Sequence, residues 1–202
     1  DVAVPLEKVL AGLESARKAG FSPIKINTVV RKNWNDKTII QLINHFRNTG
    51  DIVRFIEYMD VGSTNGWNMS DTVPTEELLT TINTRFPIVP VETNYVGEVA
   101  KRYRLVDGSG EIGFITSVTQ PFCGTCTRAR VSADGKLYTC LFSTAASLDL
   151  ASFLRAEQDN DLILEKINAI WKKRSDRYSE IRSQIDSSTS HKNKVEMSYI
   201  GG

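Results

Sequence analysis

The sequence lacks most of the features that would assign it at once to a common protein class. Its 202 residues include only 3 cysteines and 2 histidines. It has no G-x-x-x-x-G-K-[ST] motif, so a nucleotide phosphate would have to be held without that glycine-rich loop. No run of about 18 consecutive apolar residues occurs, and the sequence therefore predicts no membrane helix and no membrane partner.

The charges of the chain nearly cancel. Lysine and arginine together number 25, aspartate and glutamate number 24, and the net charge is +1. A nucleic-acid-binding protein usually carries a basic surface, so this composition predicts no nucleic-acid partner. Cysteines that cannot all pair fit a reducing compartment, and we expect a cytoplasmic protein.

All three cysteines lie close together in the sequence. Cys123 and Cys126 form a C-x-x-C pair, and Cys140 follows after an Asp-Gly turn signal at 134–135 that predicts a β-hairpin. The hairpin returns Cys140 to the neighbourhood of Cys126. Three thiolates in one small volume indicate a metal site.

The number of ligands leaves the metal open. A structural zinc ion takes four ligands, and the only histidines, His45 and His191, lie far from the cysteines without ligand-like spacing. A four-iron cluster can be held by three cysteines, with one iron left open to a small molecule. A disulfide between Cys123 and Cys126 would leave Cys140 unpaired. Cluster, zinc site and unliganded thiols all stay possible on spacing alone.

The first part of the chain alternates helix and strand patterns. Residues 5–19 and 36–48 predict amphipathic helices, and residues 24–30 and 52–58 predict β-branched strands. This order indicates βα units with a parallel sheet. We interpret residues 1–60 as the last βα units of a partial α/β barrel.

The second part has a different pattern. A short helix is predicted at 75–86, and antiparallel strands are predicted at 98–106 and 111–118. After the cysteine hairpin the chain is helical over 148–184. We interpret residues 61–202 as an α+β domain that has antiparallel strands and the cluster-binding hairpin.

The cysteine segment resembles a known family motif. Its sequence, Phe122-Cys-Gly-Thr-Cys-Thr-Arg-Ala-Arg with the later Cys140-Leu-Phe, is similar to the C-terminal cluster motif of the GTP 3′,8-cyclases. These are radical S-adenosylmethionine enzymes that begin molybdenum cofactor biosynthesis. Further stretches agree in order along the chain: Pro23-Ile-Lys-Ile-Asn-Thr-Val-Val, Val53-Arg-Phe-Ile-Glu-Tyr-Met and Gly201-Gly202. The resemblance therefore extends over nearly the whole chain.

One feature of the family is absent. Its members carry an N-terminal C-x-x-x-C-x-x-C that holds the cluster which cleaves S-adenosylmethionine, and no such motif occurs here. We interpret the chain as the back portion of a longer protein. We expect this portion alone to bind GTP and a 4Fe-4S cluster without catalysing the reaction.

The resemblance implies the conversion of GTP to (8S)-3′,8-cyclo-7,8-dihydroguanosine 5′-triphosphate. In the family, an N-terminal 4Fe-4S cluster reduces S-adenosylmethionine to a radical that abstracts the ribose 3′ hydrogen of GTP. A second 4Fe-4S cluster, implied here on Cys123, Cys126 and Cys140, holds the guanine base through its open iron. The resemblance also implies a homodimer, a downstream cyclic pyranopterin monophosphate synthase, and a mitochondrial location in a eukaryote.

Lys25 and Arg54, one on each predicted strand of the first part, are candidate phosphate ligands. Lys25 and Asn27 alternate with isoleucines, so they would point into the barrel, where a lysine needs an anion. Otherwise Lys25 extends to solvent. Arg54 either pairs with Glu57 or another acid, or contacts the ligand. The resemblance implies that Lys25 and Arg54 bind GTP. It also implies that Met59, which the pattern alone would place in the core, contacts S-adenosylmethionine.

Two arginines follow the C-x-x-C pair. Arg128 and Arg130 are two residues apart, so they share one strand face, and guanidinium groups suit phosphates or a purine edge. They could also be solvated edge residues. The resemblance assigns Arg128, Ala129 and Arg130 to GTP. By contrast, the charged run from Trp171 to Arg177 predicts a solvated face or a domain contact, with no further role.

The register of the hairpin decides whether the arginines and the thiolate share a ligand. A three-residue loop ending in a left-handed Gly135 places Arg128 opposite Cys140 and Arg130 opposite Tyr138. A two-residue loop would turn both arginines to the other face. We predict the three-residue loop, because one GTP molecule cannot easily span both faces of a ribbon.

Two other functions stay open from the sequence. The three cysteines and one outside ligand could hold zinc in a non-catalytic binding module. The chain could also belong to another radical S-adenosylmethionine enzyme with an auxiliary cluster and a different substrate.

Overall fold

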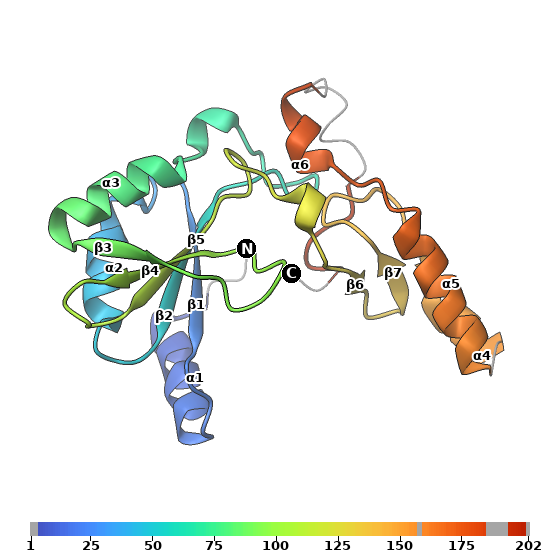
Figure 1. Ribbon diagram of the computed structural model, residues 1–202, viewed down its shortest axis with the longest axis horizontal. Coiled ribbons are helices and arrows are strands. Elements are labelled where there is room, and N and C mark those ends of the chain that lie inside the picture. The colour runs from blue at the N-terminus through green and yellow to red at the C-terminus, as the bar shows by residue number, and fades with distance from the viewer. Residues whose placement is uncertain (1–3, 157–158, 185–193, 201–202) are drawn as a thin grey trace. The chain divides into compact units, whose positions relative to one another are not determined.

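The computed structural model describes residues 4–156, 159–184 and 194–200, which form two compact units (Figure 1). The first unit contains the residues up to Tyr58 together with Ser70–Gln120. The second unit contains Met59–Met69 and the residues from Pro121 onward. The predicted C-terminal Gly201-Gly202 and His191 lie outside the described residues.

The first unit is built on a five-stranded mixed sheet (Figure 1). The first three strands in the order below pair in parallel, and the last two are added antiparallel. The strands stand in the order β1 (Lys25–Val30), β2 (Ile52–Glu57), β5 (Glu111–Ile115), β4 (Lys101–Leu105) and β3 (Ile88–Val91). The predicted α/β class and the parallel pairing of the first two strands are confirmed.

Strand alternation determines which face of this sheet is buried. Val53 and Phe55 of β2 are buried, whereas Arg54 and Ile56 point to the other face. Helices α2 (Ile39–Phe46) and α3 (Thr75–Arg85) cover the buried face. Phe55 packs near Phe114 of β5, with ring centroids 5.7 Å apart. Burial of such aromatic side chains dominates the stabilisation of a core of this size.

The helices differ from their predicted limits in informative ways. The helix predicted from Asp36 begins as a 3₁₀ turn, η1 (Asp36–Thr38), before α2. It ends at Phe46 because the chain turns through left-handed conformations at Asn48 and Gly50, with φ of 66° and 82°. Helix α1 (Leu6–Lys18) forms as predicted, and Leu13 packs on the core, whereas Leu6 of its apolar face is 65% exposed.

The two antiparallel strands predicted at 98–106 and 111–118 are present as β4 and β5, but they extend the first sheet. Strand β5 reaches that sheet by pairing in parallel with β2, Phe55 opposite Phe114. The expected domain boundary at residue 60 stays a prediction, and so does the barrel.

The second unit combines a small sheet with helices. Its sheet has the order β6 (Arg130–Val131), β7 (Lys136–Tyr138) and β8 (Leu148–Asp149). The other elements are η3 (Cys123–Thr125), α4 (Leu150–Ala156), α5 (Asn160–Lys172), α6 (Tyr178–Ile181) and η4 (Arg182–Gln184), and η2 (Met69–Asp71) spans the boundary between the units. Over the described part of the chain, no helix has both the length and the apolar character to cross a membrane.

Candidate functional site

The cysteine hairpin forms with the predicted loop. Arg130 pairs with Tyr138, and the Ser132 N–H donates to the Lys136 carbonyl at 3.0 Å, which leaves three residues in the loop. Gly135 has a φ of 81°. The prediction for Arg130 and the three-residue loop is therefore confirmed. The ladder ends at Arg130, so the placement of Arg128 opposite Cys140 stays a prediction.

Gly135 gives a direct test of this loop. A Cβ at this position would lie 2.4 Å from the Cβ of Ala151, in a left-handed backbone conformation. We expect Gly135→Ala to lower the free energy of unfolding by about 1–2 kcal/mol from the backbone alone, with a further loss from the clash. Urea unfolding measures the change.

A second substitution separates the two causes. Ala151→Gly removes the atom nearest to a Cβ at Gly135. Gly135→Ala should therefore lower stability less in the Ala151→Gly background than in the wild type, by the part that the clash contributes. The part that comes from the backbone conformation should be the same in both backgrounds. A Gly135→Ala protein as stable as the wild type would contradict the observed loop.

The three cysteines are free and partly buried. Cys123 and Cys126 lie at the two ends of a tight turn over η3, in which the Cys126 N–H donates to the Cys123 carbonyl at 3.2 Å. Cys140 follows β7, and its sulfur accepts a hydrogen bond from the Phe142 N–H at 3.5 Å. We refer to Cys123, Cys126 and Cys140 as the three-cysteine site.

The thiols of this site differ in how easily they ionise. Burial alone would raise the pKa of Cys126, but the Arg128 backbone N–H, the Arg128 guanidinium 3.4 Å from the sulfur, and Arg174 hold it below its ordinary value. Burial raises the pKa of Cys140, and the neighbouring Cys123 adds to that rise. Cys126 is therefore more ready than Cys140 to act as a thiolate ligand.

The two arginines of the hairpin lie near these thiols. The exposed Arg128 guanidinium lies over the Phe122 ring at 5.1 Å. Burial lowers the pKa of Arg130, and the charge of Arg128 adds to this, whereas Cys140 and Cys126 oppose it. Arg130 is thus within electrostatic reach of two thiols, Cys126 before β6 and Cys140 after β7. Ala129, the third predicted GTP residue here, is exposed.

The chemistry of these donors fits an iron–sulfur cluster, whose ligands are thiolates. The thiols are close enough for Cys123 to influence Cys140. Among residues 4–156, 159–184 and 194–200, however, no three or more His, Cys, Asp or Glu side chains are gathered closely enough to hold a metal ion. The ligand types therefore fit the cluster, while their arrangement is not that of a preformed metal-ion site.

The predicted GTP residues of the first unit lie on the exposed face of its sheet. Arg54 Nε donates to Asn27 Oδ1 at 2.8 Å, so Arg54 does not pair with Glu57, which lies on the opposite face. Lys25 is exposed on the same face as Asn27. A Cβ on Gly113 of β5 would come within 3.1 Å of Arg54 Cγ. Sequence reasoning missed Gly113, which leaves room for the Arg54 side chain.

Met59 is the first residue of Met59–Met69, the shorter of the two segments that form the second unit. It is half-buried, and its carbonyl accepts hydrogen bonds from the Val61 N–H at 3.0 Å and from Asn65 Nδ2 at 2.9 Å. Its backbone is therefore fixed by its own segment. A contact of Met59 with S-adenosylmethionine stays a prediction.

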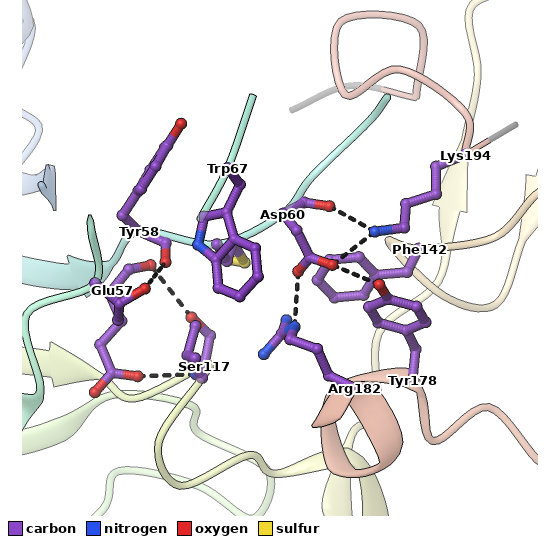
Figure 2. Close-up of polar contacts among 12 residues, drawn as sticks. Glu57, Tyr58, Asp60, Trp67, Ser117, Phe142, Tyr178, Arg182 and Lys194 are labelled. Carbon is purple, nitrogen blue, oxygen red and sulfur yellow. Dashed lines mark hydrogen bonds and ion pairs between the residues drawn. The ribbon is translucent and has the colours of Figure 1, made fainter. Parts of the chain in front are cut away.

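Asp60, next to Met59, is the centre of a buried network that the sequence did not reveal (Figure 2). Asp60 is 1% exposed, and its carboxylate accepts hydrogen bonds from Arg182 Nε and Lys194 Nζ, both at 2.7 Å. The Tyr178 hydroxyl also donates to this carboxylate, and Lys194 Nζ donates to the Asp60 carbonyl at 2.9 Å. We call Asp60, Tyr178, Arg182 and Lys194 the Asp60 network.

Aromatic rings surround the cations of this network. The Lys194 ammonium lies 4.4 Å from the centre of the Tyr178 ring, and the Arg182 guanidinium lies 5.3 Å from that of Phe142 (Figure 2). Burial alone would raise the pKa of Asp60, but hydrogen bonds from Lys194 and Tyr178 and the charges of the two cations lower it overall. The carboxylate is thus held ionised between two buried cations.

Comparison with known proteins gives consistent matches. The family model described as Molybdenum Cofactor Synthesis C matches residues 51–180. A protein named GTP 3′,8-cyclase from Acidothermus cellulolyticus is 46% identical, over 100% of this chain and 62% of its own length. Proteins of the same name from Xanthomonas campestris and Staphylococcus aureus are 48% and 43% identical, over 98% and 96% of this chain. The chain spans 56% and 57% of their lengths.

Proposed function

This chain belongs to the family described as Molybdenum Cofactor Synthesis C, and from that membership we propose that it forms the GTP-binding, second-cluster part of a GTP 3′,8-cyclase. The observation that carries the proposal is the hairpin, in which the Arg128 guanidinium lies 3.4 Å from the Cys126 sulfur and Arg130 lies within electrostatic reach of Cys126 and Cys140. Guanidinium groups beside thiolate ligands suit an anionic substrate held at a cluster. The conversion of GTP to (8S)-3′,8-cyclo-7,8-dihydroguanosine 5′-triphosphate is proposed for a protein that contains this chain.

In this proposal, Cys123, Cys126 and Cys140 hold a 4Fe-4S cluster. Bound by three thiolates, such a cluster supplies one iron with an open position for a donor atom of the guanine base. Arg128 and Arg130 donate hydrogen bonds to oxygen atoms of GTP, and the small, exposed Ala129 between them allows the ligand to approach the backbone.

The first unit contributes the other GTP residues in this proposal. Lys25 and Arg54 lie on the sheet face that α2 and α3 leave uncovered. In a barrel this face is the interior, so we propose that residues 1–60 are the last βα units of a radical S-adenosylmethionine barrel. Asn27 then orients Arg54 through its hydrogen bond at 2.8 Å.

Further partners follow from the same proposal. Met59 contacts S-adenosylmethionine, and a second 4Fe-4S cluster belongs to the complete enzyme. The complete enzyme is a homodimer that supplies a cyclic pyranopterin monophosphate synthase. It works in the bacterial cytoplasm, or in the mitochondrion of a eukaryote, and residues 61–202 form its C-terminal domain.

Anaerobic loading with iron and sulfide tests the proposal. We expect about four iron atoms per chain, and GTP binding by the loaded protein in equilibrium dialysis. Arg130→Ala should weaken GTP binding about 10- to 150-fold, because a hydrogen bond from a charged group contributes about 1.5–3 kcal/mol. Arg155→Ala is the matched control, since Arg155 is an exposed arginine of α4 in the same unit.

The alternatives predict different results. Uptake of one zinc ion per chain without any cluster would favour a zinc-stapled binding module. A loaded protein that binds ATP as tightly as GTP would favour a radical enzyme with another substrate. Equal GTP affinity of Arg130→Ala and Arg155→Ala would contradict the proposed role of the hairpin.

A further inference from the structure

The chain after helix α5 returns to the turn between the first two cysteines. Arg174 is 10% exposed, and its Nη1 donates to the Cys126 carbonyl. Its Nε pairs with Asp176 at 3.2 Å, and its guanidinium lies 4.8 Å from the centre of the Trp171 ring. Arg174 is therefore held from several sides while it binds the backbone of a predicted ligand residue. It is not part of a wholly solvated charged run.

A second residue of the same segment binds the other side of this turn. Glu180 of α6 accepts a hydrogen bond from the Gly124 N–H at 3.1 Å. Arg177 Nε pairs with the second carboxylate oxygen of Glu180 at 2.5 Å. The turn between Cys123 and Cys126 thus receives a donor and an acceptor from one segment of the chain.

The segment also touches the stretch after β7 that carries the third cysteine. The Tyr178 ring stacks on Phe142 with centroids 4.5 Å apart and an interplanar angle of 22°. The Phe142 N–H in turn donates to the Cys140 sulfur. Cavities of about 440 and 360 Å³ adjoin the cysteines, and Asp176 and Arg177 line both of them.

We infer that residues 174–180 are a positioning element for the three-cysteine site, in which Arg174 and Glu180 hold the Cys123–Cys126 turn in its ligand-bearing conformation. This inference rests on the proposed function, because it takes the cysteines as cluster ligands. Hydrogen bonds around a metal site orient its ligands and tune its potential. The positive charge of Arg174 also favours the more negative, reduced form of a cluster.

Iron retention by the loaded chain tests the inference. Arg174→Gln and Glu180→Ala should each weaken iron retention about 10- to 100-fold against a chelator. Arg174→Gln should also shift the midpoint potential of the cluster to more negative values. Lys173→Gln is the matched control, because it removes the same charge one residue earlier from an exposed side chain. It should retain iron and potential as the wild type does.

A conservative variant distinguishes the contact from a general role in folding. Glu180→Gln keeps an oxygen acceptor for the Gly124 N–H, so it should restore most of the iron retention that Glu180→Ala loses. Iron retention equal to the wild type in both Arg174→Gln and Glu180→Ala would overturn the inference and leave the proposed function standing. A wild-type chain that takes up no iron and sulfide overturns both.

Circular dichroism shows whether each variant is folded. If Arg174→Gln does not fold, Arg174→Lys decides, because lysine keeps the charge but cannot span both Cys126 and Asp176. Weaker iron retention by folded Arg174→Lys supports the positioning role. Wild-type retention by that variant overturns it.

Discussion

Asp60→Asn is expected to destabilise the second unit by about 3–5 kcal/mol, because it leaves two buried cations without their counter-charge. Asp60 is 1% exposed, and its partners Arg182 and Lys194 have side chains that are 5% and 2% exposed. Water therefore cannot readily replace the lost carboxylate. Urea unfolding measures the loss, and hydrogen exchange in Met59–Met69 shows that it lies in this unit.

The pH dependence gives an independent check. The pKa of Asp60 is lowered in the folded protein, so its contribution to stability is present above the unfolded-state pKa of about 3.9 and is lost as pH falls through the folded value. The difference in free energy of unfolding between wild type and Asp60→Asn should therefore be largest at about pH 6 to 7. It should shrink as the pH falls below the unfolded-state pKa of about 3.9. Glu165→Gln, on the exposed side of α5, should cost little. A similar small loss for Asp60→Asn would contradict the observed network.

Glu57→Gln is expected to destabilise the first unit by about 3 kcal/mol, because it replaces a fully hydrogen-bonded buried carboxylate. Glu57 is 1% exposed. One carboxylate oxygen accepts from the Thr75 N–H and hydroxyl, both at 3.0 Å, and from the Thr119 hydroxyl at 2.6 Å. The other accepts from the Val118 and Thr119 N–H groups at 2.8 and 2.9 Å.

The amide of glutamine has one oxygen and one NH₂ group. Whichever way it turns, the NH₂ group faces donors, and at least two backbone or hydroxyl groups lose their acceptor. Glu77→Gln, on the exposed surface of α3, is the matched control. Surface substitutions usually change the unfolding free energy by no more than about 0.5 kcal/mol. If the unfolding free energies of Glu57→Gln and Glu77→Gln agree within that range, the hydrogen bonds of Glu57 contribute little.

The sequence alone predicts features that depend on residues close together in the chain, such as the buried face of a strand or the register of a hairpin. The alternation of β2 places Val53 and Phe55 inward, and the Asp-Gly turn with its left-handed Gly135 fixes the hairpin register. The same alternation could have corrected one expectation. Residues three apart on a strand point to opposite faces, so Arg54 and Glu57 could not have paired within one strand.

Other features depend on partners that are distant in the sequence. Asp60 bonds to Tyr178 and Lys194, which are 118 and 134 residues away, and Arg174 reaches Cys126 across 48 residues. A buried aspartate in a polar loop has the same local sequence as a solvated one. Likewise, nothing in the charged run separates Arg174 from its exposed neighbour Lys173. Such pairings follow from the folded topology and not from periodicity.

The split of the second unit into Met59–Met69 and the residues from Pro121 onward has a consequence for synthesis on the ribosome. Asp60 emerges 118 residues before Tyr178 and 134 before Lys194. At about 5–20 residues per second, its carboxylate stays hydrated for roughly 7 to 27 seconds before both partners exist. The strands of the first unit are complete by then. The sheet of the first unit can therefore form on the nascent chain while Met59–Met69 still lacks its partners. The second unit completes its folding only after Lys194 has been translated.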